Sequence, residues 1–112
     1  MEESPIFIKT FDMIVWLMEH TQKFPKNQRF VIAKRMEDNA LDFQEALYKA
    51  TKTSKVKNIL AEADFYLFKL KLYNRMCVKL KLLSFNQFEY LAVMLNELGK
   101  LLGGWQSKLK ES

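Results

Sequence analysis

Basic side chains recur at four-residue intervals in the stretch FKLKLYNRMCVKLKLL, residues 68–83. In a helix, Lys71, Arg75 and Lys79 would stack along one row, each step advancing about 6 Å along the axis. Such a row can contact several phosphate groups of one nucleic acid strand. Residues 46–88 hold nine bases against two acids, a net charge of +7, whereas the rest of the chain holds nine bases against eleven acids. This concentration favours an anionic partner, and a merely solvated lysine-rich face is the alternative.

Residues that could perform catalysis or bind a metal are few. The single histidine, His20, has no acidic residue three positions before it, as a carboxylate-bridged di-iron bundle requires. It also has no arginine shortly before it, as small helical ribonucleases require. Cys77 falls on an apolar stripe, which indicates a structural thiol, and there is no P-loop or nucleophile elbow. The sequence therefore predicts no catalytic residue, no metal site, no cofactor and no enzymatic activity.

The composition predicts one helical domain over residues 1–112. The apolar fraction of 49% suits a single hydrophobic core, and three glycines and two prolines are too few for the turns of an all-β fold. No run approaches the roughly 20 apolar residues of a membrane span, and the acidic start MEES is unlike a secretory signal. We expect a cytoplasmic protein that does not bind membranes.

The elements that must position these side chains are four amphipathic helices, joined by short connections. Their apolar residues recur at three- and four-residue spacing, typical of helices that bury one face. The fold class is therefore predicted as all-α, an up-down-up-down antiparallel four-helix bundle. The helices are expected over about residues 5–22, 27–52, 54–83 and 85–102.

Short signals mark the predicted helix ends. Ser4 and Pro5 form a start signal for the first helix. Ser84 followed by Gln87 is the capping box that would start the fourth helix. Gly103-Gly104 is expected to end that helix, so that a short basic C-terminal tail follows.

The third predicted helix carries two apolar stripes. The first centres near Tyr66 and Cys77 and is assigned to the core, and the second lies roughly 120° away around the helix. One bundle buries only part of such a helix, so the second stripe predicts a contact between copies of the chain; stray apolar residues, or packing inside the bundle, are the alternatives. Trp16, predicted to lie opposite the stripe formed by Phe7, Phe11 and Ile14, fits the same kind of contact. The second stripe consists of Phe65, Phe68, Leu72, Met76 and Leu83.

Five segments in sequence order resemble one known family: KFPKNQRF (23–30), ALDFQEAL (40–47), LAEADFYLFKLKLYNRM (60–76), LLSFNQFEY (82–90) and LGKLLGGW (98–105). They are similar to the accessory variability determinant proteins (Avd) of diversity-generating retroelements. A broader family of small four-helix bundles also includes proteins encoded in intervening sequences of bacterial large-subunit ribosomal RNA. The phenylalanine-proline start of the second helix and the Gly-Gly-Trp segment look more like the retroelement branch.

The resemblance implies a basic, ring-like homo-oligomer, a pentameric barrel of four-helix bundles. It implies binding to the retroelement's reverse transcriptase and to its template RNA, with an RNA–DNA hybrid as a further ligand, in support of error-prone cDNA synthesis. The accessory protein is not itself the polymerase. The alternative is a ribosomal-RNA-associated bundle that acts on RNA without a polymerase partner.

These observations assign two sets of residues. The predicted interface between copies comprises Phe65, Phe68, Leu72, Met76 and Trp16. The predicted surface for nucleic acid or reverse transcriptase comprises Lys71, Arg75 and Lys79, together with Arg29, Lys69, Lys81 and Lys26.

Overall fold

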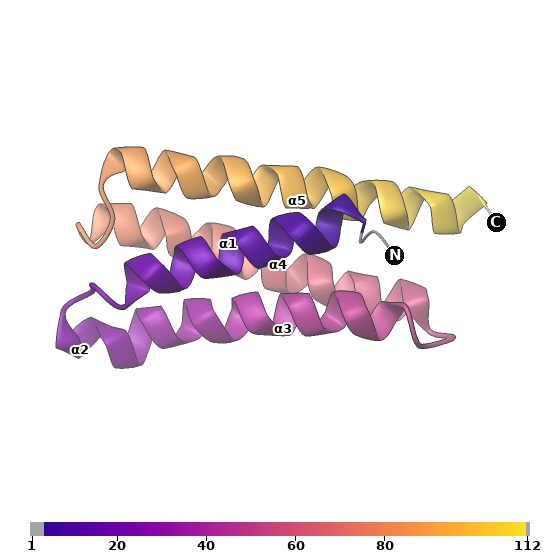
Figure 1. Cartoon of the computed structure of the whole chain (residues 1–112), viewed down its shortest axis with the longest axis horizontal. Helices are drawn as coiled ribbons and strands as arrows, with labels where there is room; N and C mark the ends of the chain where they lie inside the picture. The colour runs from indigo at the N-terminus through magenta and orange to yellow at the C-terminus, as the bar shows by residue number, and fades with distance from the viewer. Residues whose placement is uncertain (1–3, 112) are drawn as a thin grey trace.

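The computed structural model describes residues 4–111, and its regular structure over that range is entirely helical. Successive long helices run in opposite directions, so α1 begins and α5 ends at the same end of the bundle (Figure 1). The predicted all-α class and the four-helix bundle are confirmed. The elements are α1 (Pro5–Thr21), α2 (Lys26–Gln28), the π-helical segment η1 (Arg29–Ala33), α3 (Lys34–Ala50), α4 (Val56–Lys79) and α5 (Phe85–Glu111).

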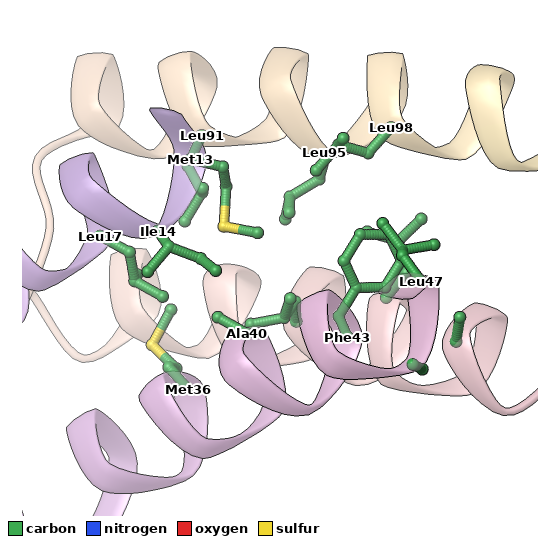
Figure 2. Packing of buried hydrophobic residues seen from close by; sticks show 14 of the residues in the cluster. Met13, Ile14, Leu17, Met36, Ala40, Phe43, Leu47, Leu91, Leu95 and Leu98 are labelled. Atoms are coloured by element: carbon green, nitrogen blue, oxygen red, sulfur yellow. The ribbon is translucent and has the colours of Figure 1, made fainter. Parts of the chain in front are cut away.

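The core is built from one apolar stripe on each long helix. On α5, Leu91, Leu95 and Leu98 recur at four- and three-residue spacing, and each is at most 1% exposed. Figure 2 shows them facing the buried side chains of α1 and α3, among them Met13 and Phe43. Burial of this area, at about 25 cal/mol per Å², is the main term that holds the helices together.

The helices occupy four corners, with α1 diagonally opposite α4. Helix α1 packs against α3 and α5, and α4 packs against the same two helices. The outward faces of α1 and α4 therefore point away from each other. An apolar residue on one of these faces cannot be covered by the other face of the same chain.

The turn between α4 and α5 differs from the prediction of a helix that runs to residue 83. Helix α4 ends at Lys79, and Lys81 adopts a left-handed conformation with φ 63°. This turn places Leu83 in the core at 5% exposure and leaves Leu80 half exposed. Leu83 was therefore wrongly assigned to the outward stripe. The left-handed conformation of Lys81 could not be predicted from the sequence, because the residue is not a glycine and the lysine-leucine alternation continues through it.

The predicted capping box at the start of α5 is confirmed. The backbone N–H of Ser84 donates to Oε1 of Gln87 at 2.9 Å, and the N–H of Gln87 donates to Oγ of Ser84 at 3.1 Å. These reciprocal bonds satisfy two donors that the first turn of a helix cannot pair internally.

The predicted end of the fourth helix at residue 102, with a basic tail beyond it, is wrong. Helix α5 continues through Gly103 and Gly104 to Glu111, and no described glycine has a positive φ. Beyond the glycines, Trp105 and Leu109 continue the apolar stripe and pack against the core. Their packing offsets a helix cost of about 1 kcal/mol for each glycine.

Helix α1 buries a face that is rotated from the predicted one. Of the predicted stripe only Ile14 is fully buried, and Phe11 is 60% exposed. Thr10 accounts for part of the difference, because a polar residue was not expected in the core. Its Oγ1 donates to the carbonyl of Ile6 at 2.6 Å, so the hydroxyl has a hydrogen-bond partner when it is buried. The buried residues of α1 are Ile6, Thr10, Met13, Ile14, Leu17 and Thr21.

Trp16 lies on the flank of α1 that faces α5. It is half-buried against the core, its ring stacks on His20 with centroids 3.8 Å apart, and the ring of Tyr90 lies at 5.5 Å. The predicted position opposite the core was wrong, since the core face itself is rotated. A role for Trp16 between copies of the chain stays a prediction.

The continuous helix through Gly104 allows the effect of an alanine at this position on stability to be predicted. A Cβ at this position meets no other heavy atom within 4 Å, and alanine favours a helix over glycine by about 1 kcal/mol. Gly104→Ala should therefore raise the free energy of unfolding by about 0.5–1 kcal/mol in denaturant titrations. A glycine in a left-handed cap would give the opposite sign, so destabilisation by Gly104→Ala would contradict the continuous helix.

Candidate functional site

The basic row on α4, here the α4 ridge, consists of Lys71, Arg75 and Lys79. Arg75 and Lys79 are exposed and Lys71 is half-buried, and the three lie on consecutive turns. Among the side chains that the structure describes, the ion pairs are Lys9–Glu97 at 2.8 Å and Lys34–Asp38 at 2.9 Å. The ridge cations are thus not neutralised by a carboxylate, and their charge is available to an anionic ligand.

An apolar stripe lies beside the ridge on the outer face of α4. This α4 stripe consists of Phe65 and Phe68, each 56% exposed, Leu72 at 37% and Met76 at 40%. The two phenylalanine rings stack with centroids 6.2 Å apart. Exposed apolar residues grouped in this way often mark an interaction site, and their exposure agrees with the sequence prediction for these four residues.

A second outward stripe lies on α1, and sequence reasoning did not assign it to any function. This α1 stripe consists of Ile8, Phe11 and Val15, which are 50%, 60% and 41% exposed. The three- and four-residue spacing was visible in the sequence, but Phe11 was counted in the core. Asp12 and Glu19 are exposed on the same helix, so the α1 stripe has acidic neighbours. The α4 stripe lies between the ridge and Lys69, with Asp64 as an acidic neighbour of Phe68.

The assigned basic residues separate into two groups around the α4 stripe. The α4 ridge lies on the side of α5. Lys69 lies on the side of α3, with its Nζ 4.8 Å from the ring centroid of Phe65 and 5.1 Å from that of Tyr66. Lys69 also lines a hollow beside η1 together with Phe30 and Arg35. The structure therefore does not join Lys69 to the ridge.

The remaining assigned cations lie at the chain turns. Lys26 and Arg29 are exposed at the start of the continuous helical segment formed by α2, η1 and α3. Lys81 is exposed in the turn after α4. Arg29 opens η1, which leaves its neighbours Phe30 and Val31 73% and 54% exposed. Single π-helical turns often occur at functional sites, and no sequence signal indicated one here.

A groove between α4 and α5 borders the ridge. It contains two hollows of about 530 and 320 Å³ that share Phe68, Lys71 and Asn96 in their walls. Lys71 reaches across the groove, where its Nζ would lie 3.5 Å from a Cβ on Gly99. Lys100 lines the larger hollow, which adds a fourth cation to this surface.

The residues considered for catalysis are held in structural contacts. Nδ1 of His20 lies 2.7 Å from the carbonyl oxygen of Trp16. Cys77 is fully buried, with Sγ 3.4 Å from Sδ of Met36, and burial raises the pKa of its thiol to about 12. Over the described residues, no group of three His, Cys, Asp or Glu side chains could hold a metal ion. No described helix is both long and apolar enough to cross a bilayer.

The fold and its surfaces define a small basic four-helix-bundle protein with cationic and apolar residues on one outward helix face. The chain belongs to the bAvd-like family, whose sequence profile matches residues 6–109. This match confirms the resemblance to accessory variability determinant proteins. Among curated proteins, none matches the chain.

The burial of Cys77 predicts low reactivity. Because burial disfavours the thiolate, which is the reactive form, a disulfide exchange reagent at pH 8 should modify Cys77 in the native protein only as fast as the chain opens. The raised pKa also means that the unfolded thiol ionises first. The contribution of the buried Cys77 thiol to the free energy of unfolding is full below about pH 9 and is lost as the pH rises towards 12.

Substitution separates a structural thiol from a functional one. Cys77→Ser should cost about 1–3 kcal/mol of stability, because a hydroxyl replaces a thiol in an apolar site, whereas the folded variant should bind the same ligands as the wild type. Rapid modification of native Cys77, or a folded variant that no longer binds, would contradict the structural role.

Proposed function

We propose that this chain is a non-enzymatic accessory protein of a diversity-generating retroelement. It binds the reverse transcriptase and template RNA or cDNA through the basic surface of α4, in support of mutagenic reverse transcription. The observation that carries this proposal is the α4 ridge, three cations on consecutive turns without a carboxylate partner among the described side chains. The bAvd-like family match supports this function over the ribosomal-RNA-associated alternative.

The ridge suits attraction to a phosphate backbone. Its three cations span eight residues, about 12 Å of helix axis, so neighbouring phosphates of one strand can each meet a positive charge. Lysine offers a point charge, while Arg75 adds a planar fork that can bind one phosphate through two hydrogen bonds. Contacts of this kind position a strand but do not read its sequence. Low sequence preference fits a protein that assists copying of a template.

Self-association would multiply this attraction. The two outward stripes support contact between copies, because they lie on opposite corners and cannot cover each other within one chain. The α1 stripe of one copy can instead cover the α4 stripe of the next. The charges agree with this pairing, since Asp12 and Glu19 accompany the α1 stripe while Lys69, which is not part of the ridge, flanks the α4 stripe.

A contact between two different faces is head-to-tail, and it closes into a ring when the rotation between copies fits. The homopentamer implied by the family resemblance is one such ring. In it, one nucleic acid that reaches several copies gains affinity through effective concentration, without any new type of contact.

Mixing two variants tests the head-to-tail contact. Phe11→Lys places a charge in the α1 stripe and Leu72→Lys places one in the α4 stripe, so each protein alone should lose its oligomer. Each retains one intact face, and the mixture should form a one-to-one dimer in light scattering after size exclusion. Wild type should have a mass several times 13.3 kDa. A wild-type monomer, or variants that do not recombine, would contradict the contact.

Charge removal tests the ridge. Replacing Lys71, Arg75 and Lys79 together by glutamine should weaken single-stranded RNA binding, since each phosphate contact adds about 0.7 to the slope of log affinity against log salt. The slope should therefore fall by about 2 for each copy that engages the strand. Lys108→Gln with Lys110→Gln, on exposed positions near the end of α5, is a matched control. The oligomer should survive in both proteins.

Reverse transcriptase binding is measured with the same two proteins, the ridge variant and the Lys108/Lys110 control. A loss confined to the ridge variant means that the polymerase shares the ridge. Wild-type affinity and salt slope for both partners in the ridge variant would show that the ridge is only a solvated face, contrary to the proposal. Genomic location beside a reverse transcriptase gene and paired repeats supports the retroelement role, whereas location inside a ribosomal RNA gene supports the alternative.

A further inference from the structure

The groove between α4 and α5 contains a buried polar group that the bundle leaves unsatisfied. Asn74 is 1% exposed, and its Nδ2 donates to the carbonyl of Phe88 at 3.0 Å. Its Oδ1 is buried and has no hydrogen-bond partner among the described residues. An unpaired buried acceptor is costly, and native proteins seldom retain one without a ligand or function. Asn74 lines the smaller hollow, but Oδ1 itself is covered, so a donor in the hollow reaches it only after a local shift of the wall.

The walls of that hollow suit a flat aromatic ring. It encloses about 320 Å³, at the lower end of the roughly 300–1,000 Å³ typical of small-ligand sites. Phe68 and Phe88 supply aromatic faces, and Ala92 and Leu95 supply apolar contact. Aromatic side chains are the usual platforms on which proteins stack unpaired bases.

The rim of the hollow is cationic. Lys71 and Arg75 of the α4 ridge line it on one side, and Lys100 lines the adjoining hollow, where Asp64 is the acidic member of the wall. An aromatic floor, a buried acceptor and a cationic rim together match a base joined to a phosphate. An uncharged apolar peptide segment would leave both the acceptor and the cations unpaired.

We propose that the α4/α5 groove holds one nucleotide of a single-stranded nucleic acid, with its base in the smaller hollow. After this shift a base N–H donates to Oδ1 of Asn74, the ring packs against Phe88, and the phosphate lies at Lys71 and Arg75. This inference rests on the proposed function and adds a base-binding site to the phosphate-binding ridge.

The acceptor defines what the site selects. Each of the four bases carries an N–H on its Watson–Crick edge, so one acceptor can bind any of them and distinguishes an unpaired base from a paired one. Paired bases have this edge occupied and their faces stacked. The groove therefore selects single strands, such as an exposed template, without selecting a sequence.

The test compares a single-stranded RNA with a ribose-phosphate strand of equal length that lacks bases. Wild type should bind the RNA about tenfold more tightly at fixed salt, the typical gain for one stacked base. Ala92→Leu places a larger side chain in the α5 wall of the smaller hollow, where the base is proposed to lie. Asn74→Leu removes the acceptor, together with the donor to the carbonyl of Phe88, and keeps the branching of the side chain. Both should reduce the tenfold ratio towards one and leave the salt slope unchanged.

Val93→Leu is the control, because it places a leucine at the next position of the same helix, where the side chain is 57% exposed and lines neither hollow. It should retain the tenfold ratio. Equal wild-type binding of both strands, with the salt dependence intact, would overturn the base site and leave the proposed function standing. The base site would also be overturned if both groove variants kept the tenfold ratio but lost self-association or reverse transcriptase binding. Failure of wild type to bind either strand would overturn both proposals.

Discussion

The surfaces of this protein depend on one constraint: α4 carries more apolar side chains than a four-helix bundle can bury. A helix in such a bundle hides an apolar face little more than about 100° wide, and α4 fills that face with residues such as Leu67, Leu70 and Cys77. Phe68 and Leu72 must then project outward. The helix is covalently continuous with the core, so this second stripe cannot turn inward without exposing the first. Only another molecule can cover it.

The same helix register places charge beside this stripe. Four-residue steps put the ridge between the stripe and α5, and the small residues Ala92 and Gly99 on α5 leave a groove next to it. Asn74 lies on the α5 side of the core face and directly precedes Arg75 of the ridge in sequence. A contact between copies, a phosphate-binding ridge and a base-binding hollow can therefore occupy adjacent strips of one helix. In the account proposed above, self-association and nucleic acid binding are consequences of a single sequence pattern.

Sequence periodicity was sufficient to predict the helices and the outward exposure of the α4 stripe, because helix geometry alone decides which residues share a face. It failed where tertiary packing decides the outcome. Trp105 packs against the core and carries α5 through two glycines, and the left-handed Lys81 moves Leu83 inward. The groove depends on how closely two helices approach each other, and the acceptor of Asn74 is unsatisfied because of its neighbours in space. Neither feature can be found from the sequence pattern of a single helix.

The methionines allow a direct test of whether another molecule covers α4. Met76 lies in the α4 stripe and is 40% exposed in the single chain, whereas Met13 and Met36 are fully buried and serve as internal references. Hydroxyl-radical labelling of the protein at micromolar concentration, read by mass spectrometry, reports the oxidation rate of each. If copies cover the stripe, Met76 should oxidise nearly as slowly as Met13 and Met36. Oxidation of Met76 at the rate of an exposed methionine, with the references intact, would contradict the account.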